Sequence, residues 1–195
     1  MKKKSVLLFD FFGVISTEIA PIWFDKHYSE EDAKRLKAEI FVPADLGLIT
    51  EDDTYVKIEE LTGIPREQVK EEFYSLVNIN TELLSHINKL KKAYKVYVIS
   101  NASSTFLRNL LSTYSLYEYF DGIFISAEMK IAKPDVKYFD FVLDSIGISP
   151  EDAIMTDDNP NNVAAASKAG IDGIVFENTD DFITKLYKII EQLEA

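Results

Sequence analysis

Val6-Leu7-Leu8-Phe9-Asp10-Phe11-Phe12-Gly13-Val14-Ile15 is the stretch that decides the fold. Its apolar run is too short to cross a membrane, and it predicts a strand buried on both faces that is followed by a glycine turn. Asp10 then lies at the carboxyl end of the strand, where ligands gather in an open parallel α/β sheet. A carboxylate among so many apolar side chains is costly to bury unless it holds a cation or performs chemistry. Asp10 is therefore the first candidate functional residue, with a simple turn-capping role as the alternative.

Size and composition limit the classes of protein to which the chain can belong. Its 195 residues suit one core of ordinary size, or a core that carries a modest insertion. With 33 acidic and 21 basic residues the formal net charge is −12, which argues against nucleic-acid and membrane partners, although a local pocket can still bind an anion. The chain has no cysteine, so disulfides and thiolate metal sites are excluded.

The first residues do not predict secretion. Met1-Lys2-Lys3-Lys4 and the apolar run after it resemble the start of a signal peptide, but Asp10 splits the run and no convincing cleavage site follows. We therefore expect a cytoplasmic protein, either a monomer or a homodimer.

Residues 17–80 carry helix signals and no strand-like apolar run. Ser29-Glu30-Glu31-Asp32 opens an amphipathic segment that extends to Phe41, and Thr50-Glu51-Asp52-Asp53 resembles a capping sequence for a helix that extends to Leu61. Pro65 fits the first position of a third helix. Helices with no strand between them predict a small bundle inserted into the chain.

From residue 81 onward, helices and strands alternate regularly. We expect strands at residues 96–99, 122–125, 153–156 and 173–176, and helices at residues 82–92, 104–114, 134–146, 160–168 and 180–192. With the first strand, this pattern predicts an α/β fold: a three-layer, Rossmann-like parallel sheet with a small all-helical insertion after the first strand. The expected division is a core domain of residues 1–16 and 81–195 and a helical domain of residues 17–80.

Polar residues follow several of the expected strands. Asp10, Ser100-Asn101 and Asp157-Asp158 each come directly after an apolar run, and Lys133 lies in the loop that follows another strand. Each is a weak signal alone, since Asp and Ser often cap helices and most lysines are solvated. The carboxyl ends of parallel strands meet at one edge of the sheet, so these positions should converge.

Such a set suits nucleophilic displacement at phosphorus. An aspartate can attack a phosphoryl group and form an acyl phosphate that water later cleaves. Mg²⁺ prefers oxygen ligands, and Asp10 and Asp158 would suit it. Lys133 would offset charge on the phosphoryl oxygens, while Ser100 and the amides that begin the next helix would bind the phosphate.

On these residues the chain resembles the haloacid dehalogenase superfamily, which consists mostly of phosphatases with an aspartate nucleophile. The family's four motifs resemble Asp10-Phe11-Phe12-Gly13-Val14, Ser100-Asn101, Lys133-Pro134 and Asp157-Asp158-Asn159-Pro160-Asn161-Asn162, in that order along the chain. The likeness extends from Asp10 to the last helix. It implies that residues 17–80 form the mobile cap that such enzymes insert between their first two motifs, and that specificity resides there.

The resemblance also implies a role for each site residue, with Asp10 as the nucleophile. The implied catalytic set comprises Asp10, Ser100, Lys133 and Asp158. Phosphate would be bound by Ser100, Asn101 and Lys133. The cofactor Mg²⁺ would be held by Asp10, the backbone carbonyl of Phe12, Asp157 and Asp158, with Asn162 in support. The implied activity is hydrolysis of a small phosphorylated metabolite, for example a sugar phosphate, through an aspartyl-phosphate intermediate.

One position departs from the family pattern. Family phosphatases usually carry a second Asp two residues after the nucleophile, which protonates the leaving oxygen and then activates water; this chain has Phe12 there. A positioned general acid or base contributes about 10²- to 10⁴-fold, so we expect slow turnover or a good leaving group, as in a sugar 1-phosphate or an acyl phosphate. Glu18 could replace the missing acid, although a solvated turn is the favoured place for it.

Phe12 keeps other functions open. Dehalogenases of the superfamily carry an aromatic residue at this position and need an arginine near the halide, for which Arg35 is the nearest candidate, but they do without an acidic pair like Asp157-Asp158. A member that only binds phosphate and Mg²⁺ would also tolerate Phe12, although it would not need Asp10. Receiver domains of two-component signalling use similar residues in a different order and lack a helical insertion.

The aromatic side chains of the insertion could line a substrate wall, but a core of their own is the favoured expectation for them. They are Trp23, Phe24, Tyr28, Phe41 and Tyr55.

Overall fold

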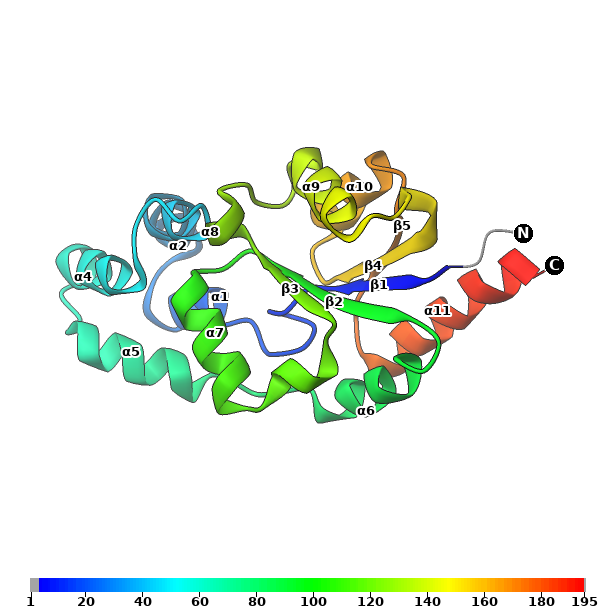
Figure 1. Ribbon diagram of the computed structural model, residues 1–195. Coiled ribbons are helices and arrows are strands. Elements are labelled where there is room, and N and C mark those ends of the chain that lie inside the picture. The colour runs from blue at the N-terminus through cyan, green and yellow to red at the C-terminus, as the bar shows by residue number, and fades with distance from the viewer. Residues whose placement is uncertain (1–3, 195) are drawn as a thin grey trace.

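The computed structural model describes residues 4–194, and its centre is one parallel sheet (Figure 1). Within the described chain, the sheet has five strands in the order β3-β2-β1-β4-β5, and all neighbouring pairs are parallel. The strands are β1 (Val6–Phe9), β2 (Lys95–Ser100), β3 (Gly122–Ile125), β4 (Ala153–Asp157) and β5 (Asp172–Val175). The predicted fold class is therefore confirmed.

Helices cover both faces of this sheet (Figure 1). One face carries α9 (Val136–Ile146) and α10 (Pro160–Lys168), and the other carries α6 (Thr81–Leu90), α7 (Ser104–Thr113) and α11 (Thr179–Glu194). The side chains of β1 alternate between the two cores, since Val6 and Leu8 contact the first layer of helices and Leu7 and Phe9 the second. Because helices cover both faces, β1 is apolar throughout, as the sequence predicted.

Three short elements complete the core: η2 (Leu116–Tyr119), α8 (Ser126–Met129) and η3 (Pro150–Asp152). The sequence did not predict α8, because a single helical turn leaves no periodic pattern. The predicted helix start at Pro134 is two residues early, since α9 begins at Val136 and the Asp135 side chain caps it by accepting a hydrogen bond from the Lys137 amide. No helix within residues 4–194 is both long and apolar enough to span a bilayer.

Between β1 and α6 the described chain forms helices and no strand of the sheet, as predicted. They are α1 (Ala20–His27), α2 (Glu30–Leu36), the π-helical turn η1 (Lys37–Phe41), α3 (Val42–Asp45), α4 (Glu51–Thr62) and α5 (Arg66–Ser75). The sequence did not resolve α1 as a separate helix. In Figure 1, α1, α2, α4 and α5 lie beyond the end of the sheet toward which β1 runs. We refer to residues 17–80 as the helical segment.

The helical segment has an apolar core of its own, drawn from all of its longer helices. The core includes Ile19, Trp23, Phe24, Leu36, Ile40, Tyr55, Ile58, Val69 and Phe73. Thr50 and Asp53 form the predicted capping box at the start of α4. The predicted place of Pro65 is one residue off, because Pro65 is the N-cap of α5 and not its first helical residue.

Two neighbouring stretches connect the helical segment to the core. Ser16 and Ile79 form an antiparallel bridge. The Thr17 amide donates to the Asn78 carbonyl at 3.1 Å, and the Asn80 amide donates to the Ile15 carbonyl at 2.9 Å. The chain therefore leaves the core and returns to it at one place, where residues 15–17 and 78–80 lie side by side.

A tight turn after α3 also touches the core. Gly47 has a φ of +62°, and a Cβ placed on it would lie 2.3 Å from the carbonyl oxygen of Ala127 in α8. Glycine alone permits both the left-handed backbone and this close approach. The contact holds the carboxyl-terminal end of α3 against α8. Gly63 offers a comparison, since its φ is +74° and no atom lies within 4 Å of an added Cβ.

We expect Gly47→Ala to lower the free energy of unfolding by more than Gly63→Ala does. Gly63→Ala adds left-handed strain of about 1 kcal/mol, whereas Gly47→Ala must also displace the Ala127 carbonyl, for a total of about 2–3 kcal/mol. Chemical denaturation of both variants beside the wild type measures the difference. Equal losses would show that the turn after α3 does not rest on α8.

Candidate functional site

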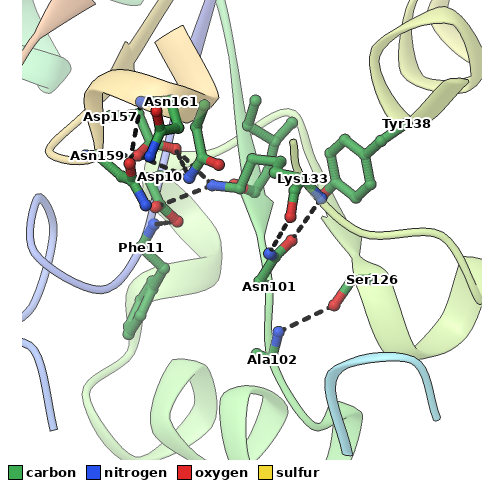
Figure 2. Close-up of polar contacts among 12 residues, drawn as sticks. Asp10, Phe11, Asn101, Ala102, Ser126, Lys133, Tyr138, Asp157, Asn159 and Asn161 are labelled. Carbon is green, nitrogen blue, oxygen red and sulfur yellow. Dashed lines mark hydrogen bonds and ion pairs between the residues drawn. The ribbon is translucent and has the colours of Figure 1, made fainter. Parts of the chain in front are cut away.

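Three strand ends bring a lysine and two aspartates into contact (Figure 2). Asp10 follows β1 and Asp157 ends β4, and these two strands are neighbours in the sheet. The Lys133 ammonium lies 2.8 Å from Asp10 Oδ2 and 2.7 Å from Asp157 Oδ2, and it donates to the Ile99 carbonyl of β2 at 3.0 Å. All three charged side chains are buried. The structure thus brings these predicted residues together at the carboxyl edge of the sheet.

Both carboxylate oxygens of Asp157 accept hydrogen bonds from protein donors. Oδ1 accepts hydrogen bonds from the Asn159 amide at 2.9 Å and the Asn162 side chain at 3.0 Å. Oδ2 accepts from Lys133 at 2.7 Å and from Asn162 at 3.1 Å. A carboxylate offers about four such positions. Asp157 therefore ties Lys133 to the first turn of α10, where Asn162 lies buried.

Asn101 holds the backbone of Lys133 with two hydrogen bonds. Its side-chain oxygen accepts from the Lys133 amide at 2.9 Å, and its side-chain nitrogen donates to the Lys133 carbonyl at 2.8 Å (Figure 2). The sequence placed Asn101 among the phosphate-binding residues. In the structure its side chain is engaged in positioning the lysine.

Ser100 is fully buried at the end of β2, and its hydroxyl has no hydrogen-bond partner in the described part of the chain. A buried hydroxyl without a partner is costly, and an oxygen-rich ligand would satisfy it. Ser100 is not among the residues that line the cavity described below, although the next residue, Asn101, is.

Asp158 completes an acidic cluster, and its carboxylate fits only because residue 13 is a glycine. A Cβ on Gly13, which has a φ of +81°, would lie 2.4 Å from the Cγ of Asp158. One carboxylate oxygen from each of Asp10, Asp157 and Asp158 lies within 4.8 Å of the others. Carboxylate oxygens are the ligands that Mg²⁺ prefers, so the residues present fit a divalent cation.

The electrostatics of the cluster also favour a bound cation. Burial raises the pKa of Asp10 well above its usual range; Lys133 opposes this shift, and the charge of Asp157 adds to it. Burial and then Asp157 also raise the pKa of Asp158. One lysine cannot neutralise the three clustered carboxylates. A deprotonated Asp10 therefore calls for a further positive charge nearby.

The cluster opens into a cavity of about 370 Å³ whose walls come from both the core and the helical segment. The core contributes Asp10, Phe12, Asn101, Phe106, Lys133, Asp158 and Asn162, among others. The helical segment contributes Glu18, Lys37, Phe41, Asp45, Glu51 and Tyr55, among others. This volume suits a small molecule. The site is acidic, which again favours a cation beside any phosphate ligand.

Phe12 forms part of the apolar wall next to Asp10. Its ring stacks on Phe106 of α7, with centroids 6.1 Å apart and an interplanar angle of 14°, and meets Phe11 edge to face at 5.0 Å. It packs against both the core of the sheet and the core of the helical segment. Phe106 had no signal in the sequence, because a single aromatic residue on a helix is usually a core residue.

Three carboxyl groups of the helical segment line this cavity, those of Glu18, Asp45 and Glu51. The preference for a solvated turn at Glu18 is wrong: Glu18 is partly buried in the cavity wall, and burial, followed by the charge of Asp158, raises its pKa. Sequence reasoning missed Asp45 altogether. Burial raises the pKa of Asp45 to about 7; Glu18 adds to the shift, and Lys37 and Lys133 oppose it. The one available signal was the Asp-Leu-Gly turn that places Asp45 just before Gly47.

The structure also settles the place of other residues of the helical segment. Arg35 is exposed and pairs with Asp32 at 3.4 Å and Glu39 at 3.8 Å, as expected for a surface charge. Trp23 and Phe24 lie in the core of the segment, whereas Phe41 and Tyr55 also line the cavity. Some of the aromatic residues thus form only the core of the segment, and others also form part of the cavity wall.

Comparison with known proteins bears on this site. The family profile described as haloacid dehalogenase-like hydrolase matches residues 24–176. A sesquiterpene phosphatase from Aspergillus oryzae is 28% identical over 172 residues, covering 86% of this chain and 87% of that protein. A D-ribitol-5-phosphate phosphatase from Bacteroides thetaiotaomicron is 24% identical over 160 residues, covering 77% and 78%.

Two further similarities concern length and structure. A drimenol cyclase from Aspergillus calidoustus is 28% identical over 161 residues, but this chain spans only 30% of that protein. A HAD family enzyme from Bacteroides thetaiotaomicron, solved in complex with magnesium and inorganic phosphate, superposes with a TM-score of 0.76 at 27% identity, covering 89% of this chain and 94% of that one.

We expect Lys133→Met to cost far more stability than Lys185→Met. Lys133 lies buried between two carboxylates, and its removal leaves them without a counter-charge, at about 3–5 kcal/mol. Lys185 also contacts two carboxylates, Glu177 at 3.1 Å and Asp181 at 2.6 Å, but on the surface, where the loss is about 1 kcal/mol or less. Chemical denaturation at pH 7 with a chelator present measures both. Similar losses would contradict the contribution assigned to Lys133.

Asp45 should make stability depend on pH. Its pKa is about 7 in the folded chain and near 3.8 when solvated, so the folded state keeps a proton that the unfolded state has lost. The stability that this group contributes below pH 4 is lost as the pH rises to 7, at up to about 1.4 kcal/mol per pH unit. Asp45→Asn should therefore become more stable relative to the wild type between pH 4 and pH 7. Asp140→Asn, at an exposed position of α9, is measured beside it as the matched control.

Proposed function

The chain belongs to the haloacid dehalogenase-like hydrolases, and we propose that it is a magnesium-dependent phosphatase that acts on a small phosphorylated metabolite through an aspartyl-phosphate intermediate on Asp10. The observation that carries the proposal is the buried contact of Lys133 with Asp10 and Asp157 at the base of a cavity of about 370 Å³. The phosphatases among the relatives support the reaction class.

Asp10 has the surroundings that a nucleophile needs. Its Oδ1 accepts a hydrogen bond from the Phe11 amide at 2.6 Å, and its Oδ2 contacts Lys133 at 2.8 Å, so the carboxylate is fixed in the wall of the cavity. Attack of a carboxylate oxygen on phosphorus releases the alcohol portion of the ester and leaves the phosphoryl group on Asp10; water then cleaves the acyl phosphate. Lys133 would offset the charge of the phosphoryl oxygens, and the unpartnered hydroxyl of Ser100 would donate to one of them.

Mg²⁺ would be held by Asp10, the backbone carbonyl of Phe12 and Asp158. When bound it supplies positive charge that favours the deprotonated form of Asp10 and offsets charge on the phosphate. The resemblance implied Asp157 as a further ligand. Because its oxygens already accept from Lys133, Asn159 and Asn162, we assign Asp157 to positioning these three residues.

The helical segment is proposed to act as a cap over a core made of residues 1–16 and 81–195. Three features support this division: the segment has its own apolar core, it joins the rest of the chain at one place, and it supplies one wall of the cavity. Cap residues that face the cavity would then select the substrate.

Halide release is less well supported. The required arginine is absent from the cavity lining within the described residues, and Arg35 is exposed and paired on the surface. A purely binding role leaves Asp10 unexplained, since the contact with Lys133 and the acidic cluster give it the environment of a nucleophile.

The decisive experiment is phosphate release from a panel of sugar phosphates, other alkyl phosphates, nucleotides and acyl phosphates, with Mg²⁺ or with a chelator. We expect release that depends on Mg²⁺ and falls by about 10⁴-fold or more in Asp10→Asn. Asp25→Asn, at an exposed position of α1, should retain wild-type activity. Calorimetric titration with Mg²⁺ should show weaker binding in Asp158→Asn. Release that persists in Asp10→Asn, or with the chelator, would contradict the proposal.

A further inference from the structure

We propose that Asp45 is the proton donor to the leaving oxygen, so that the acid absent from position 12 is supplied by the helical segment. This inference rests on the proposed phosphatase function. It adds a catalytic residue and changes the expected substrate class, because an enzyme that protonates the leaving oxygen can release an ordinary aliphatic alcohol. The expected substrate is thus a phosphate monoester of an aliphatic alcohol, and an activated leaving group is not required.

The loop after Asp10 cannot provide the proton. Phe12 carries no titratable group, and its ring is held between Phe11 and Phe106. Any acid must therefore come from another part of the cavity wall. Besides the acidic cluster, the carboxyl groups that line the cavity are Glu18, Asp45 and Glu51, so the choice lies among these three.

Asp45 is held in place from two sides. It ends α3, which follows η1 without interruption, and the next turn rests on α8 through Gly47 and the Ala127 carbonyl. In Figure 1 this part of the helical segment adjoins α8, at the edge of the sheet where β3 ends. Asp45 is thus fixed relative to the core although it belongs to the helical segment, and it shares the cavity with Asp10.

The surroundings of Asp45 suit a donor at neutral pH. Burial raises its pKa to about 7; the Glu18 charge acts in the same direction, while Lys37 and Lys133 act against it. No hydrogen bond from another described residue is among these influences, so the carboxyl proton is free to meet a ligand. A general acid works best with a pKa close to the working pH.

The other two carboxyl groups fit the role less well. After burial, the strongest influence on Glu18 is the charge of Asp158, so Glu18 lies toward the proposed cation, which would hold it deprotonated. Glu51 accepts a hydrogen bond from the Tyr55 hydroxyl at 3.1 Å. Asp45 is a partly buried carboxyl that has no such partner among the described residues.

The proton balance is complete with this chain's own groups. As Asp10 Oδ bonds to phosphorus, the bond from phosphorus to the ester oxygen breaks, and that oxygen takes the proton of Asp45 and leaves as the alcohol. Asp45 is then a carboxylate. It accepts a proton from the water that attacks the aspartyl phosphate, which releases inorganic phosphate, restores Asp10 and reprotonates Asp45.

The test compares two leaving groups in three proteins. 4-Nitrophenyl phosphate releases a stable phenolate that needs no proton, whereas an alkyl phosphate such as glycerol 3-phosphate does need one. We expect Asp45→Asn to lower kcat/KM for the alkyl ester by about 100-fold or more and for the aryl ester by less than about tenfold. Glu18→Gln, from the same cavity wall, should lower both by the same factor. Asp45→Glu, which keeps a carboxyl group, should recover part of the alkyl activity.

The outcomes separate a failure of the role proposed for Asp45 from a failure of the proposed phosphatase function. An unchanged ratio of the two activities in Asp45→Asn, or a selective loss of alkyl activity in Glu18→Gln, would overturn the role of Asp45 and leave the phosphatase function intact. A wild type that hydrolyses neither ester, with Asp10→Asn no different, would overturn the proposed function and this inference with it. The pH dependence of the stability of Asp45→Asn checks independently that the variant folds.

Discussion

The contact of one ammonium with two carboxylates organises this molecule. Lys133 reaches Asp10 at 2.8 Å and Asp157 at 2.7 Å, and all three side chains are buried. Moving such charges out of water is costly, and the cost is offset only if geometry and hydrogen bonding are good. The sheet provides this geometry, since β1 and β4 are adjacent and parallel and β2 offers the Ile99 carbonyl to the same ammonium. Without Lys133, the buried carboxylates of Asp10 and Asp157 would face each other with no positive charge between them.

The carboxylates of the acidic cluster differ in how many hydrogen bonds they accept from the surrounding protein. Asn162 and the Asn159 amide complete the contacts of Asp157, and Asn101 fixes the backbone of Lys133. The carboxylate of Asp158 lies in the space that the missing side chain of Gly13 leaves. One carboxylate of the pair in the fourth motif is therefore committed to the protein, and its neighbour stays free to face the cavity. The two adjacent residues differ in this way because Asp157 ends β4 and Asp158 begins the loop before α10.

The sequence predicts the sheet and the residues at its edge because both follow from local pattern. An apolar strand buried by helices on both faces is unmistakable in Val6–Phe9, and the end of each strand fixes the place of Asp10, Asn101 and Asp157. The wall of the cavity opposite these strand ends could not be predicted from the sequence. Asp45, Glu18 and Phe106 meet the site through tertiary placement of helices and turns, which no periodicity records. The boundary errors at Pro65 and Pro134 have a local cause: a proline can precede a helix as well as begin it.

Phe12 joins the helical segment to the core at the position next to the proposed nucleophile. An aspartate in its place would keep the acid within the core loop, independent of the position of the helical segment. The phenyl ring instead packs against both apolar cores and stacks on Phe106, so it joins the segment to the core with apolar contact. If the proton comes from Asp45, nucleophile and acid lie on different parts of the chain, and they meet only while the turn at Gly47 rests on α8. Chemistry on a poor leaving group would then depend on the contact between this turn and α8.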